Sequence, residues 1–150
     1  MLRDPNLIPL SHQHHNALAM CVLTRRSLAE DPSPANGARL ARRVIDRYEL
    51  ELANHFAIEE QILFPAIENA LGELSLVADL LAEHRQVEDL VAQLRSAPTA
   101  ELLERLCGLL VRHIRREESE LFQMAQARLP QPVLREVGAA IERRAVRICL

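Results

Sequence analysis

The segment His55-Phe56-Ala57-Ile58-Glu59-Glu60-Gln61-Ile62-Leu63-Phe64 returns later in the chain as His113-Ile114-Arg115-Arg116-Glu117-Glu118-Ser119-Glu120-Leu121-Phe122. Both copies read H-x-x-x-E-E-x-x-L-F. Residues i and i+4 share one face of a helix, because each residue advances the helix by about 100°. The repeat therefore predicts two helices that each present a histidine and the first glutamate on one face. The second glutamate of each copy, Glu60 or Glu118, is turned about 140° away and is expected at the rim or in solvent.

A third pair of the same kind lies between the two copies, where His84 is followed four residues later by Glu88. His55, His84 and His113 are spaced evenly, at 84 − 55 = 29 and 113 − 84 = 29 residues. With a rise of about 1.5 Å per residue, His84 and His113 come to nearly the same height on neighbouring antiparallel helices. The step from His55 to His84 is looser, because Pro65 is expected to bend the path between them.

Helix breakers divide the chain into five helical stretches, expected at 11–30, 33–70, 73–95, 99–129 and 132–148. Ser11 is a plausible cap for the first stretch, and Ser33 followed by Pro34 is typical of the start of the second. Pro65 is expected to kink the second helix or to end it early. Short loops between long amphipathic helices predict an all-α, up-down antiparallel four-helix bundle with a short C-terminal fifth helix, in one domain over residues 1–150.

The three histidine–glutamate pairs lie on apolar stripes, so they face the core of the predicted bundle. Buried carboxylates without partners cost several kcal/mol each, against a net stability of roughly 5–15 kcal/mol for a small protein. A shared metal centre removes this conflict, and imidazole and carboxylate ligands suit iron, manganese or zinc. Carboxylates from facing helices can also bridge two metals.

The bulk composition excludes several classes of protein. The net charge of −3 gives no general attraction to nucleic acid or to anionic membranes. No apolar run approaches the ~20 residues of a membrane span, and the N-terminus lacks the apolar region of a signal peptide. Cys21, Cys107 and Cys149 are widely spaced and odd in number, which fits a reducing compartment. These features predict a cytoplasmic protein that binds neither nucleic acid nor membrane.

These motifs resemble the hemerythrin HHE cation-binding family over nearly the whole chain. The segment 55–67 is also similar to the di-iron proteins that repair iron–sulfur clusters. Those proteins carry an additional N-terminal cysteine-bearing domain that is expected to be absent here, so the resemblance does not extend to the repair role.

The family resemblance implies a ligand set for two iron ions, with manganese or zinc as alternatives. Glu59 and Glu117 would bridge the two metals, and one histidine from each helix would complete the set: His15, His55, His84 and His113. On the first helix His15 is favoured, because His15 and Leu18 resemble the family's His-x-x-Leu motif. The helical wheel supports His14 instead, since His14 shares a face with Leu10, Leu18 and Cys21.

Glu88 stands where oxygen-carrying hemerythrins have a second histidine on this helix. The exchange implies a harder, more anionic site that stabilises higher oxidation states and disfavours reversible oxygen carriage. Glu88 would serve as a ligand itself or orient His84 from outside the ligand set.

Three functions agree with the sequence. The first is a di-iron protein that binds or senses oxygen or nitric oxide, or that handles iron. The second is a peroxidase or oxidase with a small diatomic molecule or peroxide as its substrate. The third is a metal-free helical interaction module. The sequence leaves open whether the protein is an enzyme. The amphipathic last stretch favours either a homodimer interface or a cover for the end of the bundle.

Overall fold

The structure is a computed structural model that describes residues 2–148, so Cys149 lies outside the described residues. Within that range the regular elements are all helical and no strand occurs, as predicted. The chain enters through a short 3-10 turn, Pro5–Leu7, in which Asp4 accepts a hydrogen bond from the backbone N–H of Asn6. None of the helices in the described range combines the length and the apolar character needed to cross a lipid bilayer.

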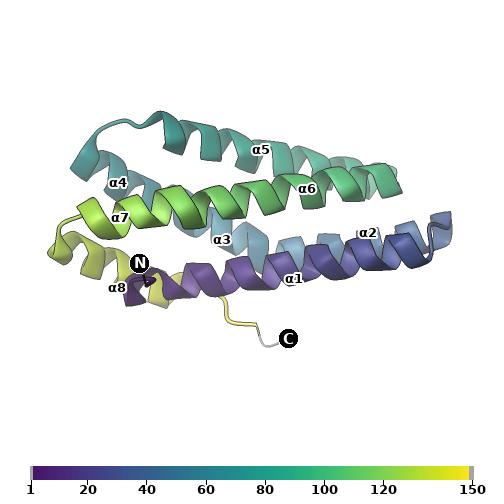
Figure 1. The fold of residues 1–150 in the computed structure, drawn as a ribbon, viewed down its shortest axis with the longest axis horizontal. Coiled ribbons are helices and arrows are strands. Elements are labelled where there is room, and N and C mark those ends of the chain that lie inside the picture. The colour runs from purple at the N-terminus through teal and green to yellow at the C-terminus, as the bar shows by residue number, and fades with distance from the viewer. Residues whose placement is uncertain (1, 149–150) are drawn as a thin grey trace.

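Four helical rods form the bundle (Figure 1). α1 and α5 are single helices, whereas the second and fourth rods contain π-helical turns that divide them into shorter helices. α1 contacts α2 and α6, and α5 contacts the same two from the opposite corner. The helical segments are α1 (Ile8–Glu30), α2 (Pro34–Arg47), α3 (Ala53–Ile58), α4 (Phe64–Leu71), α5 (Ser75–Ser96), α6 (Ala100–Arg116) and α7 (Phe122–Arg128).

The ends of the rods agree with the predicted boundaries, with three exceptions. The hydroxyls of Ser33 and Thr99 cap α2 and α6, and Gly72 ends α4 with a positive φ of 84° that only glycine adopts readily. α1 begins before Ser11, whose hydroxyl donates to Glu118 instead of capping a helix. The second rod does not end at Pro65, which is the second residue of α4, just beyond the π-helical turn Glu59–Leu63, and is followed by helix to Leu71. A π turn already interrupts the regular hydrogen-bond ladder, so a missing N–H costs less there.

The third exception is the last helix, α8 (Gln131–Arg144), which ends four residues earlier than predicted. α8 lies across the end of the bundle beside the N-terminus (Figure 1) and contacts the first turn of the chain, α1 and α3. Leu134, Val137 and Ile141 are buried in these contacts. The apolar stripe that suggested a dimer interface is therefore used within the chain as a cover, and the homodimer stays a prediction.

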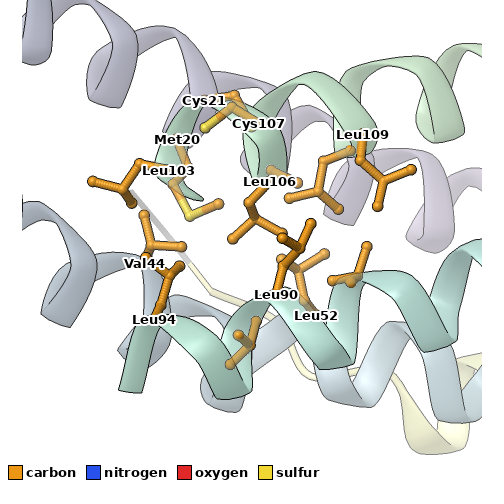
Figure 2. Close-up of a cluster of buried hydrophobic side chains, with 14 of the residues drawn as sticks. Met20, Cys21, Val44, Leu52, Leu90, Leu94, Leu103, Leu106, Cys107 and Leu109 are labelled. Carbon is orange, nitrogen blue, oxygen red and sulfur yellow. The ribbon is translucent and has the colours of Figure 1, made fainter. Parts of the chain in front are cut away.

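Two separate apolar cores fill the bundle. The first lies toward the α1–α2 turn, and Figure 2 shows part of it, with Leu90 and Leu94 of α5 facing Leu103 and Leu106 of α6. The second lies toward α8 and contains Leu7, Ile67 and Phe122 among others. The two cores are separated by a layer of polar side chains.

Candidate metal centre

The polar layer between the two cores consists of four histidines and two glutamates, each at most 2% exposed. On every rod the apolar residues before the layer belong to one core, and those after it belong to the other. The polar residues of all four rods therefore lie at the same height along the bundle. This agrees with the equal heights inferred for His84 and His113 from their spacing, and it adds His14 and His55 to the same level. The six residues are His14 of α1, His55 of α3, Glu59 just after α3, His84 of α5, His113 of α6 and Glu117 just after α6.

The two glutamates each lie between two histidines. One oxygen of Glu59 is 3.2 Å from Nε2 of His55 and 3.2 Å from Nε2 of His84. One oxygen of Glu117 is 2.5 Å from Nε2 of His113 and 3.4 Å from Nε2 of His14. Each carboxylate thus joins a histidine on its own rod to one on a neighbouring rod.

These contacts define two overlapping groups of ligand atoms, within each of which all atoms lie no more than 4.8 Å apart. The first group is His14, His55, Glu59 and Glu117, and the second is Glu59, His84, His113 and Glu117. Both groups contain the same two carboxylates. Two histidines apiece and two shared carboxylates are compatible with a pair of bridged metal ions.

The protonation of the four rings follows from what their other nitrogens contact. Nδ1 of His14, His84 and His113 lies 2.8 Å from a carboxylate oxygen. Nδ1 of His55 lies 2.9 Å from Oε1 of Gln13. Oxygens of carboxylates and amides only accept hydrogen bonds, so each neutral ring carries its proton on Nδ1. All four Nε2 lone pairs then point into the layer, ready to bind a metal.

The layer is unfavourable by itself. The four Nε2 atoms and all four oxygens of Glu59 and Glu117 are buried without a hydrogen-bond partner. Acceptors face acceptors, and each buried unsatisfied group costs about 1–3 kcal/mol. A bound cation would satisfy both kinds of atom at once, so the donor set fits a pair of divalent metals.

Burial also sets the charge state of the histidines. It lowers the pKa of His113 to about 3 and lowers the pKa of His55 below its ordinary value. Burial alone would raise the pKa of Glu59, but His55 and His84 outweigh it and hold the pKa of this carboxyl below its usual range. Near neutral pH His55 and His113 therefore offer imidazole lone pairs and Glu59 offers a carboxylate, the forms that bind metal.

Aromatic rings close the layer from both sides. Phe56 stacks on His84 with 3.9 Å between ring centroids, and Phe122 stacks on His14 at 5.3 Å. The rings fix the planes of the two histidines and help to exclude water from the layer.

Each shared glutamate begins a π-helical turn, a feature that the sequence analysis did not predict. The backbone N–H of Phe64 donates to the carbonyl of Glu59, five residues back, and that of Phe122 donates to Glu117 in the same way. The angular rule for a regular α-helix does not hold through such a turn. π-helical turns occur frequently at functional sites, but no residue type announces them in a sequence.

The second glutamates of the repeat lie at the rim, as predicted, since Glu60 and Glu118 are partly exposed, but each of them also contacts a histidine of the layer. Glu60 accepts the hydrogen bond from Nδ1 of His84, and Glu118 accepts the one from Nδ1 of His14. The third carboxylate of this kind, Glu83 of α5, accepts from His113 and was missed. Its sequence signal was its position beside His84, which places it at the same height on the helix.

Two of the expected ligands lie outside the layer. His15 is exposed, while its neighbour His14 lies in the layer, because Leu10, His14, Ala17 and Cys21 form the buried stripe of α1. His14, the alternative that the helical wheel supports, therefore takes the place in the layer that the family motif predicts for His15.

Glu88 is partly exposed, and both its oxygens accept hydrogen bonds from Arg85 at 2.7 Å. Pairing with Arg85 near solvent costs less than burying a third carboxylate beside Glu59 and Glu117. The structure thus gives no support to Glu88 as a ligand. The expectation of a harder, more anionic site depended on this residue, so the structure does not support that expectation either.

The fold and this layer define an all-α bundle whose buried histidines and glutamates are compatible with metal binding. A family model described as Hemerythrin HHE cation binding domain matches residues 7–125, which is more than half of the chain and includes all six residues of the layer. The chain belongs to this family. No curated protein and no solved structure gave a significant match to it.

Proposed function

We propose that the protein holds two iron ions in the layer and uses them to bind a small molecule such as oxygen or nitric oxide. The observation that carries this proposal is the pair of ligand groups that share Glu59 and Glu117. A single metal would leave one pair of histidines unsatisfied, whereas two metals use all four Nε2 atoms. The mixture of imidazole and carboxylate ligands suits iron, with manganese and zinc as alternatives that analysis can separate.

In this proposal His14 and His55 hold one ion, His84 and His113 hold the other, and the two carboxylates lie between them. When bound, the metals would supply redox and Lewis-acid chemistry. The protein supplies the rest: Glu60, Glu83, Glu118 and Gln13 orient the rings, and the two apolar cores exclude water. Because the layer is so deeply buried, the geometry favours a ligand of a few atoms over a larger substrate.

The test is metal analysis of protein produced in iron-supplemented medium, together with its absorption spectrum. We expect two iron ions per chain, one for each ligand group, and iron–ligand charge-transfer absorption. Binding of nitric oxide or oxygen would change that absorption. Turnover of peroxide by the iron-loaded protein would instead favour the peroxidase alternative. Protein that takes up no iron, manganese or zinc, and gains no thermal stability from them, would contradict the proposal.

A further inference from the structure

The chain beyond α8 runs back over the bundle and is held there by main-chain groups. After Arg144 the backbone becomes extended, with φ −68° and ψ 124° at Ala145. The N–H of Val146 donates to Oδ1 of Asn54 at 3.0 Å, and the carbonyl of Val146 accepts from Nε2 of Gln13 at 3.1 Å. The carbonyl of Arg144 accepts from Nδ2 of Asn54 at 2.9 Å. These bonds give a physical reason for the early end of α8.

Gln13 connects this segment to the metal centre. The side chain of Gln13 is 2% exposed, and its Nε2 also donates to Oδ1 of Asn54 at 3.0 Å. Because the amide nitrogen is used on two carbonyl oxygens, Oε1 must face the other way, where Nδ1 of His55 donates to it at 2.9 Å. The orientation of the Gln13 amide, and with it the proton position on His55, is thus set by Asn54 and Val146.

His55 differs in this respect from the other three histidines. They donate to Glu118, Glu60 and Glu83, which lie on three of the four rods of the bundle. His55 donates to a neutral amide whose own partners lie partly in residues 144–146, beyond the region that the family model matches. A carboxylate partner makes a ligating histidine more basic than a neutral partner does. The half of the centre formed by His14 and His55 therefore has one carboxylate partner, and the half formed by His84 and His113 has two.

We propose that Gln13, Asn54 and the main chain of Val146 form a positioning relay for His55. Through this relay the C-terminal segment controls how tightly the His14–His55 half of the centre holds its metal, and that half is the more easily emptied one. The proposal rests on the proposed function, since it assigns different affinities to the two halves of the same centre. Gln13 and Asn54 are positioning residues and are not ligands.

The test is the release of iron to a chelator from anaerobically loaded Fe²⁺ protein. We expect two phases in the unchanged protein, and Gln13→Leu should accelerate only the faster phase, by roughly 10–100-fold, as is typical for the loss of a partner to a ligating residue. Gln13→Glu retains an oxygen that can accept from His55 and should slow this phase again. Asn36→Leu is the matched control, because Asn36 is also a buried amide with several hydrogen bonds but lies at the α1–α2 turn, away from the centre.

A second pair of variants tests the main-chain part of the relay. Val146→Pro removes the N–H that donates to Oδ1 of Asn54. Proline can be accommodated here, because the backbone of Ala145 already has the extended conformation that a following proline requires. Val146→Ala retains both main-chain groups. We expect Val146→Pro to accelerate the fast phase and Val146→Ala to leave it near the rate of the unchanged protein.

The relay also predicts a reciprocal effect, because coupling between two sites acts in both directions. Filling the centre with Fe²⁺ should slow hydrogen exchange at the amide of Val146, and the Gln13→Leu variant should lose this protection. If the unchanged protein binds no metal, the proposed function itself fails. If it binds two ions but Gln13→Leu and Val146→Pro release both at the unchanged rate, the relay is only structural and this inference is overturned.

Discussion

The carboxylate of Glu60 accepts a hydrogen bond from Nδ1 of His84 at 2.8 Å, across the interface between two rods of the bundle. Glu118 does the same for His14, also at 2.8 Å. Each copy of the repeated motif therefore supplies both a shared carboxylate and an orienting carboxylate. The first glutamate of each adjacent pair lies in the layer, and the second orients a histidine of another rod. Two residues on the same helical face could not do both.

Glu60→Ala and Glu118→Ala should each weaken metal binding by roughly 10–100-fold, because they remove the group that orients a ligating ring and raises its basicity. Competition with a chelator measures the affinity. Glu120→Ala is the control, since Glu120 is exposed and forms an ion pair with the side chain of Arg116. If the affinity for metal is unchanged in both variants, these glutamates do not orient the ligating histidines and are ordinary surface residues.

His14→Ala and His15→Ala should differ sharply although they are neighbours. His14 is buried in the first ligand group, whereas His15 is exposed. We expect His14→Ala to bind at most one metal ion per chain, and His15→Ala to keep the stoichiometry of the unchanged protein. Metal analysis of both variants decides the assignment, and the opposite pattern would restore His15.

The sequence predicted the fold and most of the layer for a physical reason. The fold follows from local features, namely the apolar period, the caps at Ser33 and Thr99 and the even spacing of histidines. Such features set where each helix begins and ends, and therefore its length. His55, Glu59, His84, His113 and Glu117 followed from the resulting stripes, and metal ligation by them remains the proposal.

What the sequence could not provide depends on contacts between rods. The contacts of Glu60 with His84 and of Glu118 with His14 were not predicted because they join separate rods of the bundle. Gln13 and Asn54 were missed because their partners lie on other elements, 41 residues away between Gln13 and Asn54 and 90 residues away between Asn54 and Arg144. Glu88 was assigned to the layer by its spacing from His84 and by the family resemblance, but Arg85 three residues earlier provides a less costly partner.

Gly138→Ala should destabilise the protein by about 1–3 kcal/mol, the usual cost of overpacking. A Cβ at this position in α8 would lie 2.0 Å from the side-chain oxygen of Asn6 and 2.6 Å from its Cβ. Thermal or denaturant unfolding measures the effect. Gly37→Ala in α2 is the matched control, because its nearest neighbour would be 4.0 Å away and alanine favours a helix over glycine by roughly 0.5–1 kcal/mol. Equal stability of the two variants would show that α8 does not pack firmly on the first turn.

The metal-free protein should lose stability as the pH falls below about 6.5. Burial lowers the pKa of His55 and His113 from 6.5 in the folded protein, for His113 to about 3. Between the folded and unfolded values the unfolded chain binds more protons, so the free energy of unfolding decreases with falling pH, by up to about 1.4 kcal/mol per unit for each histidine. The lowered pKa of Glu59 acts in the same direction below 4.5.

Denaturant unfolding between pH 7 and pH 4 measures this slope in metal-free protein. His113→Gln should reduce the slope, because one of the titrating groups is removed. Metal-loaded protein should release its metal over the same range as protons compete for the Nε2 atoms. A flat profile of the metal-free protein would mean that the buried rings are not held neutral.

Glu117→Gln should change metal binding and metal-free stability in opposite directions. The amide is nearly isosteric with the carboxylate but carries no charge, and its N–H can donate to an Nε2 lone pair of His14 or His113, both of which are buried without a partner. Satisfying such a group is worth about 1–3 kcal/mol, so the metal-free variant should melt at a higher temperature than the unchanged protein. The same change removes a shared anionic ligand, and the variant should lose at least one metal ion per chain. Unfolding of chelator-treated protein and metal analysis of loaded protein test the two halves separately. If the site keeps unsatisfied acceptors at the expense of stability, Glu117→Gln raises the melting temperature of the metal-free protein and lowers the metal content of the loaded protein. If the network is purely structural, Glu117→Gln lowers the stability and leaves the metal content unchanged.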